Sequence, residues 1–188
     1  MREEMGAPET VWTEAADVSC SDQVDALVHK LVKKLGRIDL LVNNVGGGLK
    51  KDLVETSDDE WQQQIQLNLT TTFNFCRAVL PVMREQGAGM IINIASKAGR
   101  LGEGNFAAYC AVKHGVVGLT RALADSEDKY GIRVNAICPG PIATEKMIAA
   151  YPDADRSNWS TPEDIAQTVL YLTLSTGHTM QGKLVDLF

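Results

Sequence analysis

The amino-acid sequence predicts an α/β fold, with a doubly wound parallel sheet and helices on both of its faces. Short apolar runs alternate along the chain with longer stretches whose apolar residues recur at helical spacing. Such alternation is typical of parallel strands joined by right-handed helical crossovers. The strand-like runs are almost continuously apolar, as expected where helices cover both faces of a sheet. The 188 residues fit one domain that spans residues 1–188.

The first elements follow from apolar spacing and from capping residues. Residues 10–18 have the composition of a strand. Ser21 or Asp22 can then cap a helix whose apolar stripe spans residues 24–35. Residues 38–44 form a short apolar run with a polar end, which predicts a second strand.

A capping box predicts the start of the next helix. Ser57 and Glu60 have the spacing at which each side chain bonds the backbone N–H of the other residue. Helical periodicity then continues to residues 80–81, with Asn68 in the middle of the helix. Residues 90–95 are the next buried strand.

The last third of the chain repeats the alternation. Residues 106–129 read as a helix, and residues 132–138 as a strand that runs into a Pro-Gly-Pro turn. Thr161 caps a final helix, with a proline in its first turn. Residues 184–188 form a last short strand.

Composition excludes several classes of function. The formal net charge is −6 and no basic stripe is present, which argues against nucleic acid and favours a small-molecule substrate. No apolar run approaches the roughly 20 residues of a membrane span, and the N-terminus does not resemble a signal peptide. We therefore expect no membrane association and a cytoplasmic protein. The four cysteines and three histidines share no metal-ligand spacing, so no metal is expected.

Polar or backbone-exposing residues follow four of the predicted strands. They are Asp17 and Val18, Asn44 to Gly46, Ser96, and Pro139 to Ile142. In open parallel sheets, ligands bind in the crevice outside the carboxyl ends of the strands. Each segment alone is weak, because Asn43-Asn44-Val45-Gly46 could be an ordinary turn. Their convergence at one edge predicts a ligand site there.

Tyr109 and Lys113 add a pair of side chains with acid/base chemistry. They are four residues apart on a predicted helix, so they share one face about one turn apart. A Tyr-x-x-x-Lys match arises by chance in roughly a few tenths of chains of this length. Together with Asn44, Asn68 and Ser96, the pair makes chance an unattractive explanation.

These segments resemble the short-chain dehydrogenase/reductase family, and the resemblance covers nearly the whole chain. It implies a Rossmann-like domain. It also implies that Tyr109 is the general acid/base, that Lys113 holds the nicotinamide ribose and lowers the pKa of the phenol, and that Ser96 binds the substrate oxygen. By the same resemblance Asn68 anchors a water in a proton relay.

The resemblance also implies a dinucleotide cofactor, NAD or NADP. Asp17 and Val18 would border the adenine, and further residues would line the rest of the cofactor: Asn44, Val45, Gly46, Tyr109, Lys113, Pro139, Gly140, Ile142 and Thr144. A homodimer or homotetramer is expected, built on residues 61–75, residues 109–123 and the last strand.

Elementary electrostatics supports the role expected for Lys113. A free phenol titrates near pH 10, and bringing its pKa to about 7 requires roughly 4 kcal/mol at about 1.36 kcal/mol per unit. One ammonium at ~4 Å supplies about that much at an effective dielectric constant near 20. Ser96 can donate to a carbonyl oxygen that gains negative charge as hydride arrives.

The chain departs from the family pattern at its start. No glycine-rich strand-to-helix turn precedes Asp17, so we expect an N-terminally incomplete domain that lacks the first two strands and the first helix of the family. Gly46-Gly47-Gly48 follows a different strand and cannot replace that turn. The missing second strand carries the ribose contact that separates NAD from NADP. The choice of cofactor is therefore open.

Three interpretations of function follow. We favour an NAD(P)-dependent oxidoreductase that interconverts a secondary alcohol and a ketone. The alternative is a noncatalytic remnant that cannot hold the dinucleotide and acts as an interaction or assembly module. The third, coincidence of the motifs, we rate below roughly one in twenty. The family likeness is strongest to ketoacyl reductases and to sugar or diol dehydrogenases, and fold does not choose between these substrates.

Overall fold

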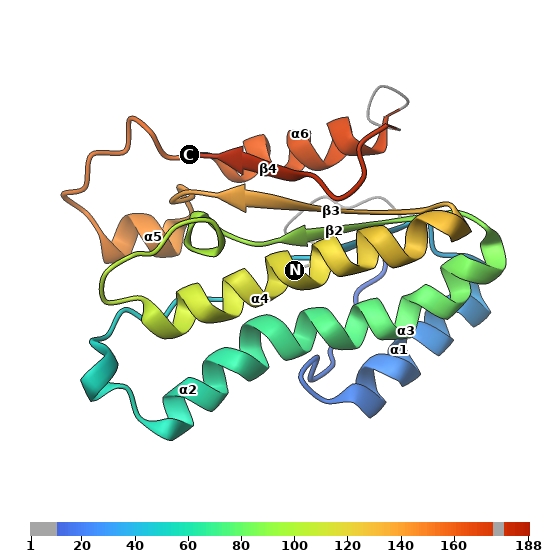
Figure 1. Ribbon diagram of the computed structural model, residues 1–188, viewed down its shortest axis with the longest axis horizontal. Helices are drawn as coiled ribbons and strands as arrows, with labels where there is room; N and C mark the ends of the chain where they lie inside the picture. The colour runs from blue at the N-terminus through green and yellow to red at the C-terminus, as the bar shows by residue number, and fades with distance from the viewer. Residues whose placement is uncertain (1–10, 175–178) are drawn as a thin grey trace.

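The computed structural model describes residues 11–174 and 179–188, and their core is a four-stranded parallel sheet. The strands follow the order of the sequence across the sheet (Figure 1): β1 Leu40–Asn43, β2 Gly89–Ile94, β3 Ile132–Pro139 and β4 Leu184–Leu187. Every neighbouring pair is parallel. The predicted α/β class is confirmed, and so are the strands expected around residues 38–44, 90–95, 132–138 and 184–188.

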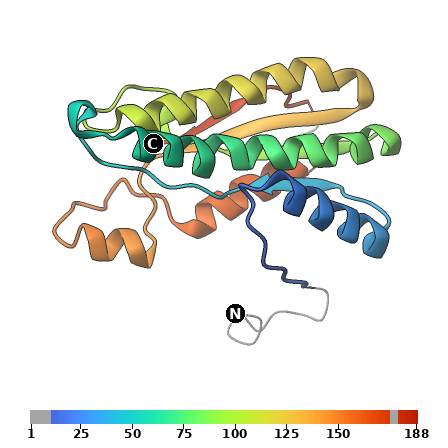
Figure 2. The same ribbon diagram turned by 90° about the horizontal axis from the view of Figure 1, so that it is seen from below.

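Helices cover both faces of this sheet. Figure 2 shows α3 and α4 lying over one face and α6 on the other. The helices are α1 Ser21–Leu35, α2 Asp58–Gln64, α3 Thr71–Gln86, α4 Ala107–Glu127, α5 Glu145–Ala150 and α6 Pro162–Thr173. None of the described helices is both long enough and apolar enough to cross a membrane.

The two faces have separate apolar cores because successive strand residues point to opposite sides. Ile91 and Val134 pack with Val24 of α1 and Met83 of α3 in one cluster. Ile92 on the next position of β2 packs instead with the residues of β3, β4 and α6 on the other face. This alternation fixes the register of each strand, because a slip by one residue would exchange the two faces.

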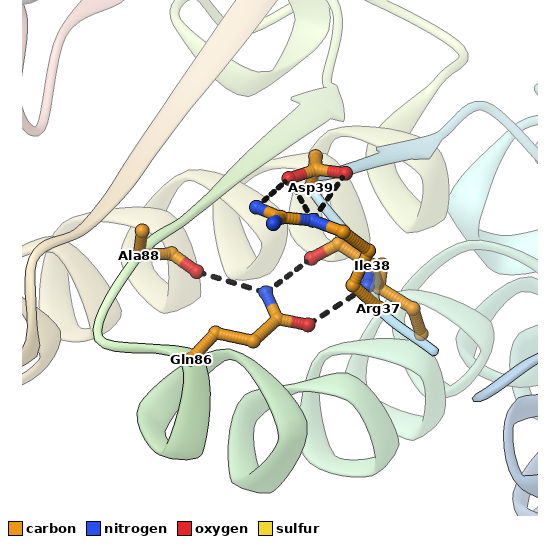
Figure 3. A network of polar contacts seen from close by, with 5 residues as sticks. All are labelled: Arg37, Ile38, Asp39, Gln86 and Ala88. Atoms are coloured by element: carbon orange, nitrogen blue, oxygen red, sulfur yellow. Dashed lines mark hydrogen bonds and ion pairs between the residues drawn. The ribbon is translucent and has the colours of Figure 1, made fainter. Parts of the chain in front are cut away.

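One side chain links the end of α3 to the segment just ahead of β1. Gln86 at the end of α3 accepts from Ile38 N at 2.8 Å and donates to Ile38 O at 2.8 Å and to Ala88 O at 3.1 Å, as Figure 3 shows. Its carboxamide thus pairs with the backbone ahead of β1 as a neighbouring strand would. Arg37 and Asp39 form an ion pair on either side of Ile38.

The predicted strand at residues 10–18 is wrong for the part of it that the structure describes, residues 11–18. These residues form no strand; Val18 packs against the apolar cluster under β1, and residue 10 lies outside the described range. The physical reason lies in the sheet order. By the family's sheet order two further strands would lie between residues 11–18 and β1. In the described residues β1 pairs with β2 alone, so the strands that residues 11–18 would pair with are absent.

The long helix opened by the capping box is present but interrupted. Ser57 and Glu60 make both reciprocal bonds of the box. A π-helical stretch, Ile65–Thr70, then separates α2 from α3, and α3 continues through Pro81 to Gly87. Wide π turns inside helices are frequent at functional sites, and this one contains Asn68.

The remaining helices differ from the predictions mainly at their ends. The N-cap of α1 is Cys20, whose side chain makes no cap bond, and neither Ser21 nor Asp22 takes that position. Thr161 caps α6 as expected and forms a second capping box with Asp164. The short helix α5, which the sequence did not predict, follows an N-cap at Thr144.

Candidate active site

The loop after β1 passes between two of the predicted site residues. A Cβ atom on Gly46 would lie 2.7 Å from Asn68 Oδ1 and 3.2 Å from Lys113 Nζ. Only glycine allows the backbone to come this close. Two residues on, a Cβ on Gly48 would lie 3.5 Å from Tyr109 Cδ1. The loop therefore brings the ends of β1, the π-helical stretch and α4 to one place.

Asn68 holds this loop with its side chain. It is fully buried, and its carboxamide accepts from Gly47 N at 3.1 Å and donates to Gly47 O at 3.1 Å. The same amide nitrogen lies 3.1 Å from the Gln64 carbonyl oxygen. The polar atoms of Asn68 are thus engaged in positioning the loop, a contact that the sequence pattern did not indicate.

Ser96 leaves the carboxyl end of β2 and caps a 3-10 turn, Lys97–Gly99. Its hydroxyl accepts from Ala98 N at 3.1 Å, and Ala95 N ahead of it donates to Ile137 O of β3 at 2.8 Å. The hydroxyl also faces the phenol of Tyr109 and lowers the pKa of that phenol. Ser96 is half-buried, and its side chain lies at the carboxyl edge of the sheet.

Tyr109 and Lys113 lie on the face of α4 that meets this edge. The Lys113 ammonium is 4% exposed, donates to Ile94 O at 2.9 Å, and sits 5.7 Å from the centre of the Tyr109 ring. Phe106 packs beside the phenol, with 6.2 Å between ring centres. The structure thus brings Asn68, Ser96, Tyr109 and Lys113 together.

The electrostatics of this pair differs from the expectation. Burial raises the pKa of Tyr109, and Glu103 and Cys110 add to the rise, while the contact with Ser96 opposes it. Burial also lowers the pKa of Lys113 to about 8. The expected lowering of the phenol pKa by the ammonium is therefore not found, because the low-polarity surroundings disfavour the charged form of each group. At neutral pH the phenol therefore keeps its proton.

A hollow of about 320 Å³ lies beside the carboxyl end of β1. Three residues expected at the cofactor line it, namely Val18, Asn44 and Val45, together with Thr71 and Thr72 of α3. The volume is at the lower end of the range for small-molecule sites. Residues 11–20, which lead from this hollow into α1, contain no glycine. The hollow thus contains three of the residues expected at the cofactor, and among the described residues no glycine-rich helix start adjoins it to receive a pyrophosphate.

The other predicted cofactor residues lie farther along the same edge. Gly140 donates to Leu187 O at 3.0 Å, and Ile142 bridges to Ser160, so the turn after β3 is tied to β4 and to the segment before α6. Pro139 ends β3. Thr144 caps α5 by accepting from Met147 N at 3.2 Å.

Asp17 is not part of the hollow. Its carboxylate accepts from Ser19 N at 3.0 Å and from Ser19 Oγ at 2.7 Å, and these bonds lower its pKa. The side chain is exposed and serves the turn that leads into α1.

Sequence reasoning missed a buried polar chain behind the site. Asn43 donates to Asn93 Oδ1 at 2.9 Å, and Asn93 donates to Thr120 Oγ1 at 2.9 Å, which connects β1, β2 and α4. An asparagine inside the apolar run of residues 90–95 was the available signal, since buried polar groups need partners. In the part of the chain that the structure describes, no three histidine, cysteine or acidic side chains gather as metal ligands would.

Comparison with known proteins gives a consistent result. The family model for short chain dehydrogenase matches residues 1–155. Levodione reductase from Leifsonia aquatica is 43% identical over 149 residues, which cover 79% of this chain and 56% of that protein. The 3-oxoacyl-[acyl-carrier-protein] reductase FabG from Thermotoga maritima is 33% identical over 196 residues, covering 100% of this chain and 79% of that protein.

Solved structures agree with these matches. The crystal structure of a levodione reductase superimposes with a TM-score of 0.88 at 33% identity, over 99% of this chain and 78% of that one. ElxO with NADP bound gives a TM-score of 0.86 at 30% identity, over 92% and 74%. A tyrosine-to-phenylalanine variant of ElxO with NADPH bound matches equally well.

Proposed function

The chain belongs to the short-chain dehydrogenase/reductase family, and from that premise we propose that it interconverts a secondary alcohol and a ketone by hydride transfer with NAD(P)(H). The observation that carries the proposal is the meeting of Tyr109, Ser96 and Lys113 at the carboxyl edge of the sheet. A half-buried phenol beside a hydroxyl and an ammonium is an acid/base group with a defined position. The matched proteins include reductases of ketones, which supports the same chemistry.

The chain's own residues have distinct tasks in this proposal. Tyr109 is protonated at neutral pH because burial raises its pKa, so it gives its proton to the ketone oxygen as the alcohol forms. Ser96 donates a hydrogen bond to the same oxygen while negative charge develops there. Asn68 holds the loop after β1 against Lys113 and takes part in proton delivery.

Some of the residues that line the hollow would hold the adenosine portion of a dinucleotide cofactor. Val18, Asn44 and Val45 would hold the adenosine portion, and Gly46 and Lys113 the nicotinamide ribose. A bound nicotinamide dinucleotide supplies the hydride. Both NAD and NADP are compatible with these residues, and NADP is bound by one matched structure. The cofactor-lining roles of Asp17, Pro139, Gly140, Ile142 and Thr144 belong to the same proposal.

The proposed substrate is a small-molecule ketone of the ketoacyl, sugar or diol class.

We also propose that the chain self-associates as a homodimer or homotetramer. Phe73 on α3 is 44% exposed and Leu67 in the π-helical stretch is 37% exposed, which leaves apolar surface on the helix expected at the interface. A cytoplasmic location is part of the same proposal.

The edge of the sheet favours a second candidate function. Leu40 and Val42 of β1 are 37% and 38% exposed, although they are core-type residues in a parallel strand. The second candidate is a noncatalytic protein that acts through contacts made at this edge. Dinucleotide affinity separates the two candidates.

The test is a fluorescence titration of the purified chain with NADH and with NADPH, followed by an assay of ketone consumption. The oxidoreductase proposal expects saturable binding and cofactor oxidation that depends on the ketone. Binding without turnover of any ketoacyl, sugar or diol substrate would contradict it, and an absence of binding up to millimolar cofactor would favour the noncatalytic candidate.

A further inference from the structure

The turn that carries Ser96 is packed tightly against α4. Ser96 O accepts from Gly99 N at 2.9 Å, and Arg100 N donates to Lys97 O at 2.9 Å, which closes the 3-10 turn. A Cβ atom on Gly99 would lie 2.7 Å from Lys113 O, so the backbone of the turn touches the helix that bears the phenol. The direction of the Ser96 hydroxyl therefore depends on where this turn lies.

Arg100 fastens the far end of the turn to the sheet. Its Nε lies 2.9 Å from Asp186 Oδ1 and its second terminal nitrogen lies 3.2 Å from Asp186 Oδ2, a bidentate geometry that fixes both side chains. Asp186 belongs to β4, 86 residues along the chain. The side chains are 32% and 36% exposed, so the pair is partly screened and its contribution to stability is small.

Cys138 fills the space between this ion pair and Ser96. It is fully buried at the end of β3 and stands directly opposite Asp186 in the register of β3 and β4. Its thiol contacts both the Asp186 side chain and the Ser96 backbone. The turn, β3 and β4 thus form one packed unit in which a shift of Arg100 would be felt at Ser96.

From this arrangement we infer that Arg100 and Asp186 are positioning residues, whose ion pair holds the turn at Lys97–Gly99 so that the Ser96 hydroxyl stays against the Tyr109 phenol. Any effect of this positioning on ketone turnover rests on the proposed function. The positioning itself is a property of the chain alone, and can be measured without cofactor or substrate.

The measurement is the ionisation of the Tyr109 phenol. The groups that face it are Ser96 from the turn, Glu103 from the loop before α4, and Cys110 and Lys113 from α4 itself. The Ser96 hydroxyl lowers the pKa of the phenol, whereas Cys110 and Glu103 raise it. A turn that no longer presents the hydroxyl should therefore raise the midpoint of phenol ionisation.

The variants are Arg100→Met and Asp186→Asn, followed by ultraviolet absorbance against pH. The signal of Tyr109 is isolated by subtracting the same variant carrying Tyr109→Phe. Each change should raise the midpoint of phenol ionisation, and so should Ser96→Ala, which removes the hydroxyl itself. Arg100→Met added to Ser96→Ala should give no further rise, and the exchanged pair Arg100→Asp with Asp186→Arg should return the midpoint towards the starting value.

Arg37→Met is the matched control, since it breaks another bidentate Arg–Asp pair at the opposite end of the sheet and should leave the midpoint unchanged. The inference is overturned if Ser96→Ala raises the midpoint and Arg100→Met does not, or if Ser96→Ala has no effect. If a variant unfolds before the phenol ionises, hydrogen exchange of the Ala98 amide at neutral pH gives the answer: faster exchange supports the inference and unchanged exchange overturns it. Raised midpoints in a chain that turns over no ketone would contradict the proposed function alone.

Discussion

At the scale of single residues, burial decides the acid/base chemistry more than the neighbouring charge does. The Lys113 ammonium lies 5.7 Å from the centre of the Tyr109 ring, yet its charged form is itself disfavoured by its surroundings, which lower its pKa to about 8. A Coulomb estimate of the effect of Lys113 on the Tyr109 pKa treats both groups as fully charged. Partial removal of both groups from water disfavours their charged forms, so that estimate does not hold here.

Replacement of Tyr109 by phenylalanine tests the proton donor. Tyr109→Phe deletes the hydroxyl and leaves the ring against Phe106, so fold and cofactor affinity should stay nearly unchanged. We expect kcat to fall by at least about 10²-fold, the usual contribution of a general acid. Steady-state kinetics beside a cofactor titration measures both quantities, and activity within tenfold of wild type would show that another group donates the proton.

The lowered pKa of Lys113 predicts a pH dependence of stability. Between its folded pKa of about 8 and the ordinary value of 10.5, the unfolded chain holds a proton that the folded chain has lost. Stability should therefore rise with pH across this window. Integrated from pH 7 to 9, the gain from this one group is about 1 kcal/mol.

The comparison variant is Lys113→Met, which keeps most of the length of the side chain and removes the charge. Urea unfolding at several pH values should show the wild-type chain gaining about 1 kcal/mol relative to this variant between pH 7 and 9. Parallel pH profiles would mean that Lys113 keeps its proton in the folded chain.

At the scale of the elements, the sequence located helices and strands through capping boxes and apolar runs, and it missed the breaks inside them. The capping boxes at Ser57 and Thr161 are local, since each bonds residues three positions apart. The π-helical stretch around Asn68 has a distant cause. Asn68 must bond both backbone atoms of Gly47, which lies 21 residues earlier.

Gln86 provides a test of how such distant contacts hold an element in place. Gln86→Ala removes three hydrogen bonds that secure the backbone on either side of the α3–β2 connection and ahead of β1. The partners are only partly buried, so we expect the free energy of unfolding to fall by about 1–3 kcal/mol. Urea unfolding measures the loss.

Gln62→Ala is the control for that measurement, because Gln62 is an exposed glutamine on α2. It should change the unfolding free energy by no more than about 0.5 kcal/mol. Equal effects of the two substitutions would show that the Gln86 carboxamide does not secure β1.

At the scale of the whole molecule, two surfaces carry exposed apolar side chains. The first is the outer face of the π-helical stretch and α3, with Leu67 and Phe73. The second is the edge of β1, with Leu40 and Val42. Each leads to a prediction.

Self-association should depend on the α3 surface. Light scattering of the purified chain at micromolar concentration should give the mass of a dimer or tetramer, and Phe73→Asp should reduce it to that of a monomer. Leu35→Asp, a change at a 61% exposed leucine on α1, is the control and should leave the mass unchanged. A monomeric wild-type chain would contradict the expected assembly.

Covering the β1 edge should stabilise the molecule and its nucleotide site together. We expect two gains from adding a segment ahead of Met1 that consists of a strand, a glycine-rich turn, a helix and a second strand. The Tm should rise, and the affinity for NADPH should increase by a large factor. The added strand would pair with β1, and the added helix start would receive the pyrophosphate. Micromolar binding of NADH or NADPH by the chain as it stands would refute this expectation.

The sequence by itself determined the α/β class, the four described strands and the four residues that meet at the site. The class and the strands follow from periodicity, local caps and apolar runs. The four site residues follow from the Tyr-x-x-x-Lys spacing, the position of Ser96 at a strand end and the resemblance to the short-chain dehydrogenase/reductase family. The tertiary structure alone decided the rest: the failure of residues 11–18 to form a strand, the clamp between Asn68 and Gly47, and the reversed direction of the Tyr109 pKa. Each of these depends on which groups lie nearby in space and how far they are removed from water, and neither quantity is written in local sequence.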